Sequence, residues 1–158
     1  MLTCDTGVAL IFYDLFKPVG KTLSLLAAIF RLILVVMLAV DSVNYFGALK
    51  LFRTANPVAT FDKLDGFSLA PFGVHCLLIG YLIYQSRFLP RFMGVLMAFA
   101  GFSYLTYVSP PLAHYLYPYN LVPGVLGEGA LTLWLLVMGV NAREWNEQAR
   151  VTMSPALR

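Results

Sequence analysis

Charged residues are scarce in this sequence. Only 12% of the 158 residues are Asp, Glu, Lys or Arg, whereas a soluble domain usually contains about 25%. Hydrophobic residues make up 59% of the chain, and the mean hydropathy is +0.75. This scarcity of charge, together with repeated long apolar runs, argues against a soluble core and predicts an integral membrane protein.

Cysteines and basic clusters are also few. Cys4 and Cys76 are the only cysteines, and their spacing fits neither a CxxC motif nor a zinc site. The formal charge is +3, but the basic residues are scattered singly among apolar runs, so we expect no nucleic-acid partner. The N-terminal tract carries Asp5 and Asp14 and no basic segment, so we expect no cleaved signal peptide. No hydrophobic signal region precedes Cys4, so we expect no lipoprotein anchor.

Signatures of known catalytic and cofactor sites are absent as well. The sequence contains no nucleophile elbow, P-loop, dinucleotide fingerprint or HExxH motif. We therefore expect no cofactor, no metal ion and no catalytic residue, and the balance is against an enzyme. An intramembrane enzyme using His75 and Glu128 as acid and base is the least favoured alternative.

Long apolar runs dominate what is present. From Leu23 to Val40 the chain is apolar except for Ser24 and Arg31, which is enough to cross a bilayer core of roughly 30 Å. The sequence predicts an all-α, polytopic transmembrane helix bundle forming a single domain over residues 1–158, with four full spans and a partial N-terminal helix. The predicted spans are residues 22–47, 67–86, 92–108 and 121–141, with the partial helix at 7–16 and a polar tail at 142–158.

The connecting segments have recognisable chemistry. Residues 53–66 are hydrophilic, and Asn56-Pro57 and Asp65-Gly66 predict turns there. Residues 109–120 contain three prolines, three tyrosines and no formal charge, which indicates an interfacial loop with tyrosines at headgroup depth. The tail begins with AREWNEQAR, which predicts a surface helix.

Arg31, His75 and Glu128 lie well inside the predicted spans, away from the span ends. An intramembrane arginine costs about 2.5 kcal/mol or more, so it normally finds a partner inside the bundle. Counted from the span ends, the three residues lie roughly 10 to 13 Å deep, so they could meet in the middle to outer half of the bilayer. We expect an ion pair between Arg31 and Glu128, with His75 nearby.

The role of this cluster stays open at the level of sequence. It can be internal packing, a binding or transport site, or, least favoured, a catalytic site. Asp41 and Asn44 are secondary candidates, because residues at i and i+3 share a helix face and could coordinate a cation near the interface. An ordinary polar helix end is the likelier interpretation of that pair.

Basic residues also predict an orientation. With alternating spans, seven Lys and Arg residues share one side, among them Lys17, Lys21, Arg87 and Arg91, whereas Lys50, Arg53 and Lys63 lie on the other. The positive-inside rule then places the C-terminus in the cytoplasm. We expect a multi-pass membrane protein.

Five segments resemble the DUF4386 family of small bacterial membrane proteins: Tyr13–Val19, Leu26–Leu32, Gly73–Leu82, Phe88–Gly94 and Gly127–Leu135. The resemblance implies a helical protein of the bacterial inner (plasma) membrane, typically longer and with six helices. This chain would then lack the first span and most of the second, which accounts for the short partial helix. The resemblance assigns no reaction, although Arg31, His75 and Glu128 fall inside the matching segments.

Two functional interpretations follow, and both place the chain in the lipid bilayer. The first is a small-molecule or lipid-binding, transport-like or sensory module around Arg31, His75 and Glu128. The second is a structural or accessory subunit of a larger membrane complex. Whether the chain binds another membrane protein or a second copy of itself is open.

Overall fold

The computed structural model describes residues 2–51 and 57–153, with side-chain surroundings for residues 2–43 and 69–151. Over these residues the chain is helical and contains no strand. The predicted all-α transmembrane bundle is therefore confirmed. Its elements are α1 (Leu2–Phe16), α2 (Lys21–Leu51), α3 (Pro57–Gln85), α4 (Arg91–Leu105), η1 (Thr106–Val108), α5 (Pro110–Leu116), η2 (Tyr119–Leu121), α6 (Val122–Val137) and α7 (Ala142–Met153).

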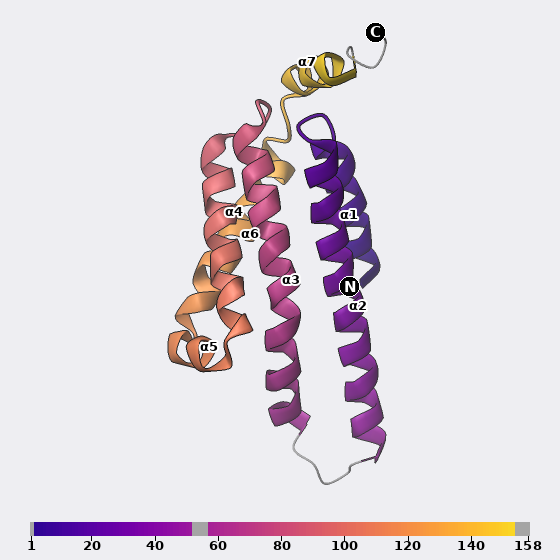
Figure 1. The fold of residues 1–158 in the computed structure, drawn as a ribbon, viewed down its shortest axis with the longest axis vertical. Helices are drawn as coiled ribbons and strands as arrows, with labels where there is room; N and C mark the ends of the chain where they lie inside the picture. Colours follow the sequence, from indigo (N-terminus) through magenta and orange to yellow (C-terminus); the bar gives the residue numbers. More distant parts are fainter. Residues whose placement is uncertain (1, 52–56, 154–158) are drawn as a thin grey trace.

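The helices pack in chain order. α1 packs against α2, α2 against α3, α3 against α4, and α6 against α4 (Figure 1). α3 therefore lies at the centre of the bundle. α1 is short, and its N-terminal end lies about halfway along α2 (Figure 1). This arrangement places the start of α1 beside the middle of the second helix.

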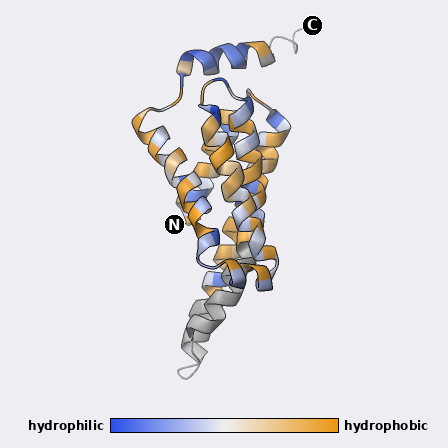
Figure 2. Ribbon diagram, turned by 90° about the vertical axis from the view of Figure 1, so that its left-hand side faces the viewer, coloured by the Kyte–Doolittle hydropathy of each residue, from blue (hydrophilic) through white to orange (hydrophobic). Residues whose placement is uncertain are grey.

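Helix length and hydropathy match a bilayer. Lys21–Val43, Arg91–Val108 and Tyr119–Val137 are each long and apolar enough to cross a membrane, and Leu69–Gln85 of α3 is apolar but slightly shorter. Many large apolar side chains of the bundle are exposed, whereas α7 is mostly hydrophilic and lies across one end (Figure 2). An all-round apolar exterior is stable when lipid surrounds it, so the chain is a polytopic membrane protein.

Glycines allow α3 and α4 to approach closely. A Cβ on Gly80 would lie 2.7 Å from the carbonyl oxygen of Gly94, and a Cβ on Gly73 would lie 2.9 Å from that of Gly101. Both distances are too short for any side chain, so the two antiparallel helices touch backbone to backbone at two levels. Small residues at helix contacts are typical of membrane bundles.

Two connecting segments differ from the prediction. α3 begins at Pro57, ahead of the predicted span at residue 67, so the turn predicted at Asp65-Gly66 is wrong. Hydropathy reports where a helix leaves the bilayer, whereas the helix itself continues into polar sequence. The predicted loop at 109–120 contains α5, whose first turn holds Pro110 and Pro111; proline is well tolerated in that position. Asn56 lies outside the described residues.

Candidate functional site

Arg31 of α2 points into the bundle and has two partners. Its Nη2 donates a hydrogen bond of 2.7 Å to Oδ1 of Asp5 on α1, which forms an ion pair. Its Nη1 lies 3.3 Å from Nε2 of His75 on α3. The side chains of Arg31 and Asp5 are only 13% and 20% exposed. Arg31 thus joins α1, α2 and α3 through one guanidinium group.

The contacts of His75 define which ring nitrogen carries the proton. His75 is buried, and its Nδ1 lies 2.8 Å from the carbonyl oxygen of Ala27. A carbonyl oxygen only accepts, so Nδ1 carries the hydrogen and donates. The lone pair of Nε2 then accepts from Arg31. The rings of Phe12 and Phe72 lie within 10° of parallel to the imidazole, so His75 is a tightly held core residue that positions Arg31.

Glu128 of α6 has a different partner from Arg31 and His75, so the cluster has two halves. The hydroxyl of Tyr104, on α4, donates to Oε1 of Glu128. Gly124 lies one turn before Glu128, and a Cβ there would collide with the Tyr104 hydroxyl. The glycine therefore makes the space in which Tyr104 reaches the carboxylate.

Phe72 lies between the two halves of the cluster, one formed by Asp5, Arg31 and His75 and the other by Tyr104 and Glu128. Its ring centroid is 5.2 Å from that of Tyr104 and 5.4 Å from Cζ of Arg31. A guanidinium over an aromatic face is attracted by the ring electrons. Phe72 also stacks on His75. The predicted residues Arg31, His75 and Glu128 are thus brought into one region, connected through an aromatic ring that the sequence interpretation did not single out.

The predicted ion pair between Arg31 and Glu128 is wrong, because Arg31 pairs with Asp5. Depth along each span placed the two residues at a similar level, but it gave no information about which helices are neighbours. Asp5 was missed because α1 was treated as a fragment, although a carboxylate in an apolar helix was a usable signal. Within the described residues, Glu128 has no ion-pair partner, and its Oε2 has no hydrogen-bond partner.

The remaining candidates lie elsewhere. Asp41 is half-buried on α2, and the side chain of Asn44 falls outside the described surroundings, so the predicted cation site at this pair stays a prediction. His114 is exposed on α5. No set of three His, Cys, Asp or Glu residues among those with described placement could hold a metal ion.

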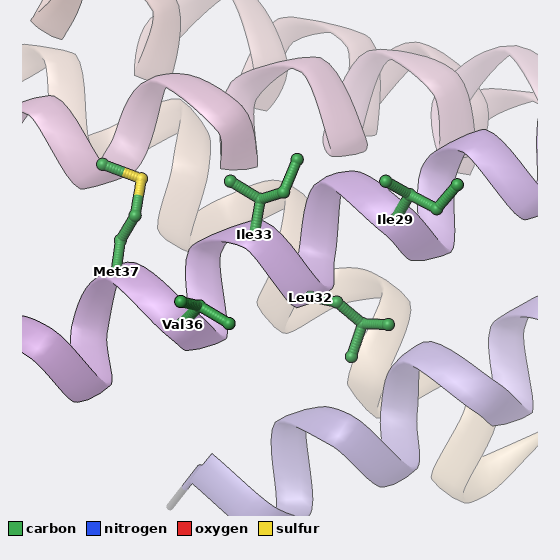
Figure 3. A pocket seen from close by; sticks show the side chains of 5 residues that line it. All are labelled: Ile29, Leu32, Ile33, Val36 and Met37. Atoms are coloured by element: carbon green, nitrogen blue, oxygen red, sulfur yellow. The ribbon is translucent and has the colours of Figure 1, made fainter.

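A groove that the sequence did not reveal runs along the exposed side of α2. Its cavity volume is about 290 Å³, and five side chains line it: Ile29, Leu32, Ile33, Val36 and Met37 (Figure 3). All five are apolar, and Val36 is 62% exposed. This groove suits a hydrocarbon chain and offers no polar group for recognition.

Comparison with known proteins covers most of the chain. The family model of a domain of unknown function, DUF4386, matches residues 1–139. A protein of Archaeoglobus fulgidus described as an uncharacterized protein is 27% identical over 146 residues, which cover 91% of this chain and 82% of the relative. No solved structure matches. The cluster from Asp5 to Glu128 lies wholly inside the region that the family model matches.

Proposed function

We propose, from the premise that this chain belongs to the DUF4386 family, that it is a small-molecule-binding, transport-like module of the membrane and that Glu128 is its recognition group. The observation that carries the proposal is the carboxylate of Glu128, which has no ion-pair partner among the residues whose surroundings the structure describes. Arg31, the cation expected to neutralise it, is bound to Asp5. A membrane-embedded carboxylate without a cationic partner is costly and usually marks a functional site.

The charges in the cluster favour one class of ligand. Asp5 and Glu128 carry carboxylates, and Arg31 is the single cation among the cluster residues. One carboxylate is therefore in excess, and a ligand that is cationic or rich in hydrogen-bond donors complements it.

The two halves of the cluster have different tasks in this proposal. Asp5, Arg31 and His75 hold α1, α2 and α3 together through contacts of 2.7 and 3.3 Å. Tyr104 and Glu128 belong to α4 and α6 and have one hydrogen bond between them. The first group is a frame, and the second leaves Oε2 of Glu128 available for a ligand.

The membrane and the orientation are part of the proposal. We infer that the chain lies in the plasma (inner) membrane with the α7 end in the cytoplasm, because Lys17, Lys21, Arg87 and Arg91 lie at that end and basic residues concentrate on the cytoplasmic side. Reporter fusions to the C-terminus, active only in the cytoplasm or only outside it, test this orientation. Activity of the outside reporter alone would reverse it.

The binding role is tested by native mass spectrometry of the protein extracted gently from its own membrane. The wild type is expected to retain a small molecule that Glu128→Gln loses, because glutamine keeps the hydrogen bond to Tyr104 but removes the charge. Glu144→Gln on α7, which removes the same charge from the polar surface helix, is the matched control and should keep the ligand.

Two results would contradict the proposal. Retention of the same molecule by Glu128→Gln would remove the carboxylate from recognition. A stoichiometric protein companion, with no small molecule, would support the alternative of an accessory subunit in a larger membrane complex.

A further inference from the structure

The end of the bundle that carries α7 gathers most of the basic residues with described surroundings. Lys17 and Lys21 lie at the turn between α1 and α2, and Arg87 and Arg91 lie at the turn between α3 and α4. All four are exposed. We call these four residues the basic rim. In contrast, the opposite connection over residues 109–120 carries exposed tyrosines and no formal charge.

α7 connects the two turns of the basic rim. The indole N–H of Trp145 donates a 2.9 Å hydrogen bond to the carbonyl oxygen of Leu15, in the last turn of α1. On the same helix, Oε1 of Gln148 lies 3.5 Å from the backbone nitrogen of Arg87. α7 therefore lies across the bundle end (Figure 1), and it is mostly hydrophilic (Figure 2).

Two cations of the basic rim lie close to tyrosine rings. Nζ of Lys17 is 5.7 Å from the ring centroid of Tyr13, and Cζ of Arg91 is 5.8 Å from that of Tyr84. Tyrosine rings typically lie at headgroup depth, and long basic side chains extend along apolar surface to place their charge at the same level. Both turns thus present a cation at the depth where lipid phosphates lie.

Few acidic residues oppose these charges. Asp14, Glu144 and Glu147 are at this end, and Glu147 pairs with Arg143 on α7 at 3.3 Å. The rim cations have no ion pair with a carboxylate among the residues whose surroundings are described. The surplus is positive, so the surface complements a negative partner.

We propose that the basic rim binds the headgroups of anionic phospholipids in the bilayer that surrounds the protein, with Lys17 and Arg91 as the principal contacts. The partner is a membrane lipid rather than a soluble anion, because both cations lie beside tyrosines at interfacial depth. This inference does not depend on the function proposed for Glu128.

The test is a titration of the purified full-length chain, in neutral detergent, with phosphatidylglycerol and with phosphatidylcholine of identical acyl chains, followed by native mass spectrometry. Each basic residue near a membrane surface is expected to contribute about fivefold in affinity. The variant Lys17→Gln/Arg91→Gln should therefore weaken phosphatidylglycerol binding by about 25-fold and leave phosphatidylcholine unchanged. Lys63→Gln removes one positive charge near the N-terminus of α3, whereas the basic rim lies at the C-terminal end of that helix. This variant is the control for the loss of a charge outside the rim.

The outcomes separate cleanly. A wild-type preference for phosphatidylglycerol that falls in the double variant, stays in Lys63→Gln and weakens with added salt supports the proposal. Equal binding of the two lipids by the wild type would overturn it, as would a preference that survives in the double variant. Displacement of phosphatidylglycerol by equimolar inorganic phosphate would also overturn it, because the rim would then be a site for soluble anions. Because both residues are exposed, an unchanged melting temperature is expected and confirms that the double variant is folded.

Discussion

Replacing Asp5 by asparagine tests the frame of the cluster. The substitution removes the counter-charge of Arg31 but keeps an oxygen that can accept its hydrogen bond. Removing one partner of a fully buried ion pair costs about 3–5 kcal/mol, whereas an exposed pair contributes about 0–1 kcal/mol. With the two side chains 13% and 20% exposed, and one hydrogen bond preserved, we expect Asp5→Asn to lower the free energy of unfolding by about 2–3 kcal/mol.

The assay is reversible unfolding by sodium dodecyl sulfate in mixed micelles, followed by circular dichroism. Asp14→Asn, an exposed carboxylate on the same helix, is the control and should change stability by less than about 0.5 kcal/mol. A double-mutant cycle with Arg31→Gln should give a coupling energy of at least about 1.5 kcal/mol between Asp5 and Arg31. Equal effects of Asp5→Asn and Asp14→Asn, or a larger coupling of Arg31 to Glu128, would refute the assigned ion pair.

Three further predictions concern the same bundle. Gly80→Ala forces a Cβ to within 2.7 Å of a neighbouring backbone oxygen and should destabilise the protein by about 1–3 kcal/mol. A Cβ in the control Gly129→Ala meets nothing within 4 Å, so this variant should keep the wild-type stability. The same unfolding assay compares the two variants, and equal stabilities would contradict the close approach of α3 and α4. Trp145→Phe removes one hydrogen bond to the carbonyl oxygen of Leu15, which is worth about 1 kcal/mol. Limited proteolysis should therefore cut α7 faster in this variant than in the wild type. An unchanged rate of cleavage would show that the hydrogen bond does not hold α7 in place. Nitrogen-15 chemical shifts at pH 8 should show His75 protonated on Nδ1, and protonation on Nε2 would contradict its bond to Ala27.

Much of the fold could be predicted because hydropathy and helix length report the bilayer directly. The runs around Arg31, Met97 and Leu131 were long and apolar enough to fix the spans, and the AREWNEQAR segment indicated the surface helix that became α7. The early start of α3 at Pro57 was not predictable in the same way, because hydropathy marks the membrane boundary and a helix can continue beyond it.

The site was predicted only in part, for a geometric reason. A residue's distance from its span end predicts its depth, and the structure connects Arg31, His75 and Glu128 through Phe72 and Tyr104. Pairing also depends on which helix lies beside which, and that information comes from packing. Asp5 reaches Arg31 because α1 lies against α2, a contact that no pattern in the sequence specified.

If Glu128 serves a ligand rather than the fold, its charge can be removed without loss of stability. The decisive experiment is the free energy of unfolding of Glu128→Gln in the absence of added ligand. Because Glu128 has no ion-pair partner among the described residues and glutamine can keep the hydrogen bond to Tyr104, we expect a stability within about 1 kcal/mol of wild type or higher. A loss of about 3 kcal/mol or more, the cost of breaking a buried ion pair, would show that the carboxylate is structural and would refute a binding role.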